Sequence, residues 1–326
     1  MTASTTRCTT AAKTRTSRTS RMAAVAAIAV AGSMLMTGCG DQTEAGKKDA
    51  GSSAGASSSA PLFAKLPEEI KKSGVIKVGT DAAYAPMESM EGNKVVGIDP
   101  EIGAALGEKL GVKFDFQNGK FDGLIGSLYS GRVHIVMSGM TDNKDRQQGL
   151  DEGKKTGKGV DFVDYFQSGT AILVKKGNPE GIKTLDDLCG KKVAVQLGTT
   201  YADAAKAQSA KCKKDGKPEL IIETPDTDAE AQVRVKAGGA VADLNDFPVA
   251  AHVAKTADGG TAFEIAGAPV DAGPFGIAVD KGNTQLRDAI KEAVDAIIAD
   301  GTYKKILDKW GASESAIDKA VINGGK

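Results

Sequence analysis

Residues 97–116 are GIDPEIGAALGEKLGVKFDF, and this stretch decides the fold class. Asp99 has the position of a helix N-cap, and the proline and glutamate that follow it are typical of a first helical turn. Apolar residues recur at helical spacing as far as Leu110, and Gly111 is a typical end of a helix. Residues 112–116 then alternate between apolar and polar, as in a strand. The stretch therefore predicts a helix that leads directly into a strand.

The same alternation of strands and helices continues on both sides of this stretch. The predicted strands are 75–79, 112–116, 133–137, 170–174, 192–196, 220–223, 240–244 and 275–279. The predicted helices are 99–110, 121–130, 185–188, 201–211, 228–236, 247–255, 284–298 and 302–310. Residues 151–159 are rich in glycine and lysine and predict an exposed loop. We therefore expect an α/β fold with mostly parallel sheets, and 326 residues are enough for two lobes.

The N-terminal segment has the composition of a signal peptide. Its first 21 residues contain no acidic residue and five basic ones: Arg7, Lys13, Arg15, Arg18 and Arg21. An apolar run from Met22 to Met36 follows, shorter than the roughly 20 apolar residues that a membrane-spanning helix needs. A buried core helix is the alternative, but the basic flank and the terminal position favour export. We expect residues 1–38 to be a lipoprotein signal peptide.

Residues 36–39, Met-Thr-Gly-Cys, resemble the lipobox of bacterial lipoproteins. The resemblance implies that Cys39 is acylated and anchors the chain to the outer face of the cytoplasmic membrane. Residues 39–66 include the stretch GSSAGASSS at 51–59 and predict a flexible tether. Such a tether lets a globular body diffuse beside a membrane without entering it.

The charge balance argues against a nucleic-acid partner. The sequence has 42 basic and 42 acidic residues, but five of the basic ones precede Cys39. The remaining chain therefore has 37 basic and 42 acidic residues, a net charge of −5. No basic patch remains that would attract nucleic acid.

Two of the four cysteines remain available for pairing. Cys8 lies in the signal segment and Cys39 is the expected lipid attachment site, which leaves Cys189 and Cys212 in the exported part. We predict a disulfide between them, because disulfides form and persist outside the reducing cytosol. Closing a loop of this size contributes about 3 kcal/mol in the chain-entropy model. Two free buried thiols are the alternative.

Six motifs follow one another along the chain. They are GTDAAYAPME at 79–88, GIDPE at 97–101, FDGLI at 121–125, SGMTDNKDR at 138–146, QLGTT at 196–200 and LNDFPVA at 244–250. Together they resemble the polar amino-acid-binding proteins of ABC importers, family 3 of the solute-binding proteins. The resemblance covers about residues 75–311. It implies a two-lobed, periplasmic-binding-protein-like (type II) clamp with a hinge, lobe I being 67–167 plus 271–326 and lobe II 168–270.

The resemblance assigns ligand-binding roles to residues of lobe I. Arg146 would bind the α-carboxylate of a free amino acid, since a guanidinium meets a carboxylate through two parallel hydrogen bonds. Tyr84 offers a flat face to the ligand side chain, and Asp81 an acceptor for its polar end. Asn143 is expected to cap the helix that presents the arginine. The lobe I set is Asp81, Tyr84, Phe121, Ser138, Gly139, Thr141 and Arg146.

Lobe II is expected to supply the facing half of the site. Residues 196–200 follow a predicted strand and open a helix, so their backbone N–H groups and the helix dipole favour the same carboxylate. Asp246 would receive the ligand ammonium group, with Asp243 as the alternative. The lobe II set is Gln196, Thr199, Thr200 and Asp246. Only a closed clamp would contact both ends of a zwitterion.

The resemblance implies an extracytoplasmic protein that delivers an amino acid to the transmembrane subunits of an ABC permease. An acid at position 81 favours arginine, lysine, histidine or glutamine over glutamate, because it would repel an anionic side chain. We expect a monomer that reaches the membrane only through its lipid anchor. We expect no cofactor, no metal and no catalytic residue.

An enzyme is the principal alternative. The sequence has two histidines, His134 and His252, and neither completes a Ser-His-Asp or Cys-His set or a metal-ligand spacing. We interpret both as structural. A dehydratase built on the same clamp is a finer alternative, which conversion of a prephenate-like acid would favour. A receptor sensor domain would need a membrane helix after Trp310, which we do not expect.

Overall fold

The structure, a computed structural model, describes residues 56–151 and 153–326. The predicted signal peptide, the predicted lipid site Cys39 and most of the predicted tether lie outside the described residues. Strands and helices alternate in the first part of the chain, as the sequence predicts. Its elements are η1 (Phe63–Lys65), α1 (Glu68–Ser73), β1 (Val75–Thr80), β2 (Ala83–Tyr84), β3 (Glu88–Glu91), β4 (Lys94–Val96), α2 (Ile98–Leu110), β5 (Lys113–Asn118), η2 (Phe121–Gly123), α3 (Leu124–Tyr129), β6 (Ile135–Val136), α4 (Lys144–Gln148), β7 (Leu150–Asp151) and β8 (Lys154–Lys155).

The second part of the chain repeats the alternation and ends with two helices. Its elements are β9 (Val160–Lys175), η3 (Leu185–Leu188), β10 (Lys192–Ala194), α5 (Thr200–Lys214), β11 (Ile221–Glu223), α6 (Asp228–Lys236), β12 (Ala242–Asp246), α7 (Phe247–Thr256), η4 (Ala257–Gly260), β13 (Phe263–Asp280), α8 (Thr284–Ala299), α9 (Thr302–Trp310), η5 (Ser313–Ser315) and β14 (Val321–Ile322). The helices α6 and α9 have the bounds that the sequence predicts. The predicted loop at 151–159 includes β8, which pairs with β7 as a short hairpin.

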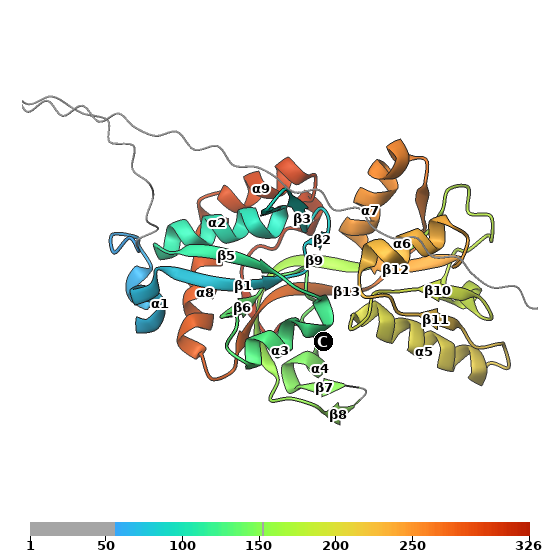
Figure 1. Cartoon of the computed structure of the whole chain (residues 1–326), viewed down its shortest axis with the longest axis horizontal. Coiled ribbons are helices and arrows are strands. Elements are labelled where there is room, and N and C mark those ends of the chain that lie inside the picture. Colours follow the sequence, from blue (N-terminus) through green and yellow to red (C-terminus); the bar gives the residue numbers. More distant parts are fainter. Residues whose placement is uncertain (1–55, 152) are drawn as a thin grey trace, which may run out of the picture. The chain divides into compact units, whose positions relative to one another are not determined.

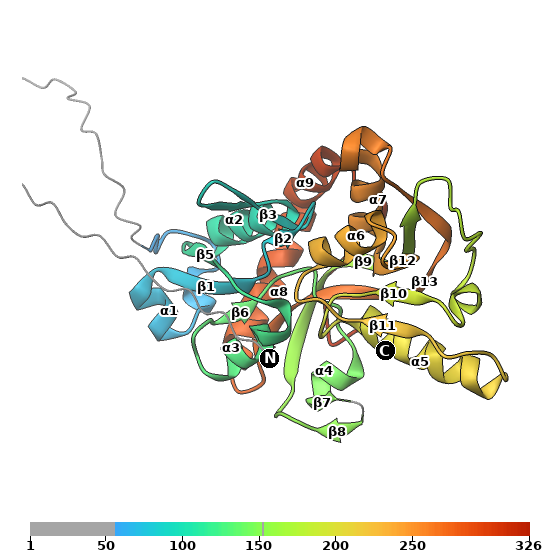
Figure 2. The same ribbon diagram turned by 45° about the vertical axis from the view of Figure 1, so that its right-hand side comes forward.

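Within the described residues, a nine-stranded sheet has the order β11-β10-β12-β9-β13-β6-β1-β5, and β14 pairs with β9. β1 is parallel to its neighbours β5 and β6, and β10 is parallel to its neighbours β11 and β12. These two parallel sets lie on opposite sides of β9 and β13 (Figure 1 and Figure 2). We call the β5-β1-β6 side lobe I and the β12-β10-β11 side lobe II. The predicted two-lobed α/β fold is confirmed.

The strands β9 and β13 are longer than the sequence predicts, and they join the lobes. The prediction placed strands only at 170–174 and 275–279. The two strands pair antiparallel with each other, while β12 pairs with β9 and β6 pairs with β13. The prediction missed the first half of β9 because charged residues such as Asp164 interrupt its apolar pattern, although Asp164 is buried. The sheets of both lobes are therefore continuous through two crossing strands.

The centre of the fold is an aromatic cluster on these two strands. Tyr165, Phe166 and Phe275 are fully buried, and the rings of Phe166 and Phe275 stack with their centroids 5.4 Å apart. Such a stack adds about 1 kcal/mol to the free energy of burial. α2 packs against α8 and α9, while α7 packs on β9 and β13 (Figure 1). The crossing strands are thus fixed by packing on both sides of the lobe boundary.

Asp99 does not cap α2, so this prediction is wrong. The helix starts earlier, after Gly97. Gly97 has a φ of 139°, a backbone conformation that in practice only glycine adopts. A Cβ on Gly97 would lie 2.2 Å from the carbonyl oxygen of Met87. Asp99 instead points into the interior, where its carboxylate accepts hydrogen bonds from the Tyr165 hydroxyl (2.6 Å) and from the backbone N–H of Gly139 (3.0 Å). It connects α2 to the loop that precedes α4.

Cys189 and Cys212 form a disulfide, as the sequence predicts, with a Cα–Cα distance of 5.6 Å. The bond ties the end of η3 to the buried face of α5 in lobe II.

No helix among residues 56–151 and 153–326 is long and apolar enough to cross a membrane. In the same part of the chain, no group of three or more His, Cys, Asp and Glu side chains could hold a metal ion.

Candidate functional site

Arg146 lies on the short helix α4, at the edge of lobe I. The side chain of Asn143 accepts a hydrogen bond from the Arg146 backbone N–H at 2.8 Å, which confirms the predicted cap. The guanidinium donates from Nη1 to the Thr141 carbonyl (2.7 Å) and from Nη2 to the Gly198 carbonyl of lobe II (3.1 Å). Its Cζ lies 5.4 Å from the centroid of the Phe121 ring. The guanidinium is therefore held from both lobes.

The charge of Arg146 is not neutralised by a direct partner. Among the described residues no carboxylate forms an ion pair with it, although the more distant charges of Asp203 and Asp246 favour its protonated form. Burial lowers the pKa of Arg146, and an arginine nevertheless stays charged in proteins. A half-buried cation whose partners are carbonyl groups is suited to receive an anion.

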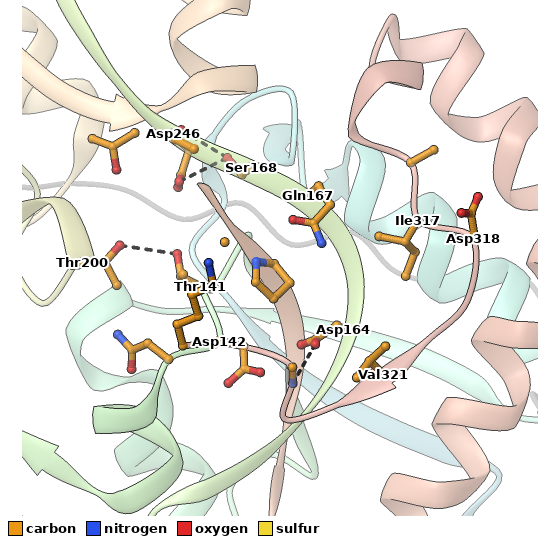
Figure 3. A pocket seen from close by; sticks show the side chains of 18 of the residues that line it. Thr141, Asp142, Asp164, Gln167, Ser168, Thr200, Asp246, Ile317, Asp318 and Val321 are labelled. Atoms are coloured by element: carbon orange, nitrogen blue, oxygen red, sulfur yellow. Dashed lines mark hydrogen bonds between the residues drawn. The ribbon is translucent and has the colours of Figure 1, made fainter. Parts of the chain in front are cut away.

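The first turn of α5 faces this guanidinium from lobe II. Thr199 caps the helix, as its position predicts, by accepting a hydrogen bond from the Ala202 N–H at 3.1 Å. Its hydroxyl donates to the Gln196 carbonyl at 2.6 Å. The Thr200 hydroxyl lies 3.4 Å from the Thr141 hydroxyl (Figure 3). The free backbone N–H groups of a first helical turn and the helix dipole favour an anion at this point.

Asp246 ends β12 and is buried, at 6% exposure. One carboxylate oxygen accepts a hydrogen bond from the Tyr84 hydroxyl at 2.5 Å. The other accepts one from the Ser168 hydroxyl at 3.4 Å, as Figure 3 shows. Burial raises the pKa of Asp246 to about 7, while the Tyr84 hydrogen bond and the charge of Arg146 act in the opposite direction. Its direct partners are neutral hydroxyl groups, so the carboxylate can pair with a cation.

Asp243 lies in a different environment from Asp246. It is fully buried and lines neither of the two cavities described below. Burial and the neighbouring Asp228 raise its pKa well above the usual range. Asn245 donates to Asp228 at 2.8 Å and accepts hydrogen bonds from the Tyr84 hydroxyl and the Asp246 backbone, both at 2.8 Å. Asp243 therefore belongs to the layer that supports the site.

Two further predicted residues form a hydrogen bond between the lobes. Asp81 follows β1, and one of its carboxylate oxygens accepts a hydrogen bond from the Gln196 side chain at 2.7 Å. Burial raises the pKa of Asp81, and this hydrogen bond partly offsets the effect. Together with the bond from Tyr84 to Asp246, it connects lobe I directly to lobe II.

Ser138 and Gly139 hold the loop behind Tyr84. The Ser138 hydroxyl accepts a hydrogen bond from the Asp81 backbone at 2.9 Å and donates to the Glu88 carboxylate at 2.7 Å. Gly139 has a φ of 50°, and a Cβ there would lie 3.3 Å from the Tyr84 ring. The ring therefore packs directly on the backbone.

The structure brings most of the predicted ligand-binding residues around one small cavity of about 10 Å³. Eight of the eleven line it: Tyr84, Phe121, Gly139, Thr141, Arg146, Thr199, Thr200 and Asp246. The other three, Asp81, Ser138 and Gln196, do not line it. A larger cavity of about 1030 Å³ adjoins it and shares the lining residues Thr141, Thr200 and Asp246 (Figure 3). The small cavity lies where the residues of the two lobes meet.

Three residues of the site were missed by the sequence prediction. Tyr201 also lines the small cavity, with its hydroxyl 3.4 Å from that of Tyr84. Asn245 links Tyr84 to Asp246. Both are sequence neighbours of predicted residues, and this proximity is the signal that could have found them. Ser168 lies on the part of β9 that was not predicted as a strand, so the sequence carried no comparable signal for it.

The two histidines lie away from both cavities. His134 Nδ1 accepts a hydrogen bond from the Lys77 backbone at 3.0 Å, and burial lowers its pKa. His252 lies on α7, where burial also lowers its pKa.

Comparison with known proteins gives one consistent result. The family model for bacterial extracellular solute-binding proteins, family 3, matches residues 76–313. The arginine-binding protein ArgT of Corynebacterium glutamicum is 28% identical over 90% of this chain and 93% of that protein. The ABC transporter arginine-binding protein 1 of Escherichia coli K12 is 32% identical over 72% of this chain and 90% of that protein. Among solved structures, an ancestral arginine-binding protein bound to glutamine is 39% identical, with a TM-score of 0.63, over 73% of this chain and 97% of that one.

Proposed function

The chain belongs to the bacterial extracellular solute-binding proteins of family 3, and we propose that it captures a free amino acid with a cationic or amide side chain and delivers it to an ABC permease. It is a binding protein and not an enzyme, like the relatives named above. It acts outside the cytoplasm, as the family description states.

One observation carries the proposal. Arg146 from lobe I and Asp246 from lobe II line the same small cavity, and neither has a direct partner of opposite charge among the residues that the structure describes. An amino acid carries both missing charges on neighbouring atoms. Its carboxylate would bind the guanidinium together with the first N–H groups of α5, and its ammonium group would bind Asp246.

Ligand binding is coupled to closure in this proposal. Since the two charged groups come from different lobes, an open clamp satisfies one end of the zwitterion and a closed clamp satisfies both. The hydrogen bonds from Gln196 to Asp81 and from Tyr84 to Asp246 would form at the same step. The ligand and these bonds together select the closed form, which a permease can distinguish from the open one.

The side chain of the ligand is assigned by charge. In this proposal Asp81 would meet the polar end of the ligand side chain and Asp246 its ammonium group, and both carboxylates would repel an anionic side chain. The arginine-binding relatives, and the neighbour bound to glutamine, support arginine, lysine, histidine or glutamine.

The finer details of location and organisation belong to the same proposal. We infer that Cys39 is acylated, that the tether predicted at 39–66 joins it to the folded part and that the protein is a monomer. The last residues of that range pack on lobe I: the Ser57 and Leu62 backbone N–H groups donate to the Gly111 and Lys109 carbonyls, and Leu66 is fully buried. The lobe boundaries at 168 and 270 would fall on the crossing strands β9 and β13.

A thermal-shift screen of the twenty amino acids on unliganded protein tests this function. We expect a rise in melting temperature with arginine or with another member of the cationic and amide group. At a ligand concentration 100 times the Kd, the expected stabilisation is about 2.7 kcal/mol. Stabilisation by glutamate alone would contradict the assignment, and conversion of a prephenate-like acid would revive the dehydratase alternative.

A further inference from the structure

The segment Ala316–Lys326 packs against lobe I beyond the end of the family match at residue 313. Within it, β14 pairs antiparallel with β9, and the Asn323 backbone N–H donates to the Phe162 carbonyl at 3.1 Å. Ile317 and Val321 line the larger cavity, on the side opposite Thr200 and Asp246 (Figure 3). The segment therefore contributes to the wall beside the candidate site.

Two buried carboxyl groups hold the segment. The Gly325 N–H donates to Asp142 at 2.8 Å. The Gly324 N–H donates to Asp164 at 3.0 Å, the dashed line at Asp164 in Figure 3. Asp142 and Asp164 are 1% and 3% exposed. Burial and the neighbouring Asp142 raise the pKa of Asp164 to about 8. Each carboxyl group thus binds one backbone amide of the segment.

The same contacts reach the helix that presents Arg146. The Gln147 side chain donates to Asp142 at 2.7 Å and to the Gly325 carbonyl at 3.4 Å. The Lys144 backbone N–H donates to the Lys326 carbonyl at 3.2 Å. Arg146 lies between Lys144 and Gln147, and α4 is only five residues long. A helix this short is not stable without tertiary contacts.

The segment lies so close to lobe I that position 325 requires glycine. A Cβ on Gly325 would lie 2.1 Å from the carbonyl oxygen of Asp142, so a methyl group there would displace the backbone of the segment. A Cβ on Gly324 would lie 2.5 Å from the Asp164 carboxylate, which is the end of a side chain and can move more easily.

We propose that the 316–326 segment positions Arg146 for the ligand carboxylate by holding Asp142 and α4 in place. The inference rests on the proposed function, because the carboxylate is its target. The segment itself does not contact the guanidinium. Its residues are positioning residues, acting through the hydrogen bonds of Asp142, Lys144 and Gln147.

The first test needs no ligand. Hydrogen exchange of the α4 amides is compared between the full chain, its Gly325→Ala variant and the control Gly126→Ala, where no atom lies within 4 Å of the added Cβ. We expect exchange in residues 144–149 to be at least about tenfold faster in Gly325→Ala, with α5 unchanged. Unchanged exchange in α4 would overturn the proposal. If Gly325→Ala does not fold, Gly324→Ala replaces it, since its methyl group meets a side chain and not backbone.

The second test separates positioning from general stability. Calorimetry compares L-arginine with L-argininamide, which lacks the carboxylate. We expect the variant to bind L-arginine about tenfold more weakly and L-argininamide as the parent does. Equal losses for both compounds, or no loss for either, would overturn the positioning role. If the parent protein does not bind L-arginine, the proposed ligand is wrong. The exchange experiment alone then tests the positioning role of the segment.

Discussion

Arg146 and Asp246 line the same small cavity, but the protein holds their charges in different ways. Arg146 is half-buried, its partners are two carbonyl groups, and its charge is permanent. Asp246 is buried, its partners are two hydroxyl groups, and its pKa is about 7. In the proposed function, the charge that would bind the ligand carboxylate is therefore fixed, whereas the charge that would bind the ligand ammonium group depends on the loss of a proton near neutral pH.

The largest effect is expected at the permanent charge. Arg146→Ala should weaken amino-acid binding by at least about 100-fold, because the ligand carboxylate would be desolvated without a cationic partner. The melting temperature of the unliganded protein should change little, since the side chain has no ion pair in the described part of the chain. Calorimetry measures the affinity, with Arg132→Ala, an exposed arginine, as the control. Unchanged affinity would remove Arg146 from the site.

The next effect distinguishes Asp246 from Asp243. Asp246→Asn should weaken binding by roughly 30-fold, because the amide oxygen can still accept the Tyr84 hydrogen bond while the charge that meets the ammonium group is removed. Asp243→Asn should bind within about twofold of the parent. An amide resembles the protonated carboxyl group that burial favours at position 243. The reverse order of affinities, measured in parallel titrations, would transfer the ammonium site to Asp243.

A smaller effect follows from the pKa of Asp246. Pairing with the ammonium group requires the carboxylate, so binding releases a proton below about pH 7 and affinity falls as the pH falls. Between pH 8 and pH 6 the ionised fraction drops about tenfold, and the affinity should drop with it. Titrations in buffers of different ionisation enthalpy would detect the released proton. An affinity that is constant over this range would show that Asp246 is already ionised in the unliganded protein.

The smallest effect on binding is expected at the disulfide. Cys212 lies about 18 Å along α5 from Thr200, so the double variant Cys189→Ser/Cys212→Ser should keep its affinity. Its free energy of unfolding should fall by about 3 kcal/mol, which thermal and denaturant unfolding can measure. Loss of affinity in the folded variant would show that α5 transmits strain to the site.

The sequence predicted the elements whose patterns are local. Asn143 and Thr199 cap their helices because capping depends on a few neighbouring residues. The prediction of Asp99 as the cap of α2 was wrong, because the conformation of Gly97 and its contact with Met87 depend on tertiary packing. The prediction of strands β9 and β13 was too short for a similar reason. Their buried polar residues are stabilised by partners far away in sequence, such as Gly324 for Asp164.

The candidate site shows the same division. The motifs predicted the residues around the small cavity, because these motifs lie on loops that follow strands or at the starts of helices. The supporting layer was not predictable from local patterns. Asp228 and the 316–326 segment act through hydrogen bonds that exist only after distant parts of the chain have met.

The decisive measurement is the crystal structure of the protein with its bound amino acid. We expect the ligand carboxylate to form two parallel hydrogen bonds with the Arg146 guanidinium, beside the first turn of α5, and the ligand ammonium group to lie on the Asp246 carboxylate. A bound amino acid that leaves Arg146 exposed to solvent, or that lies away from Asp246, would contradict the proposed site.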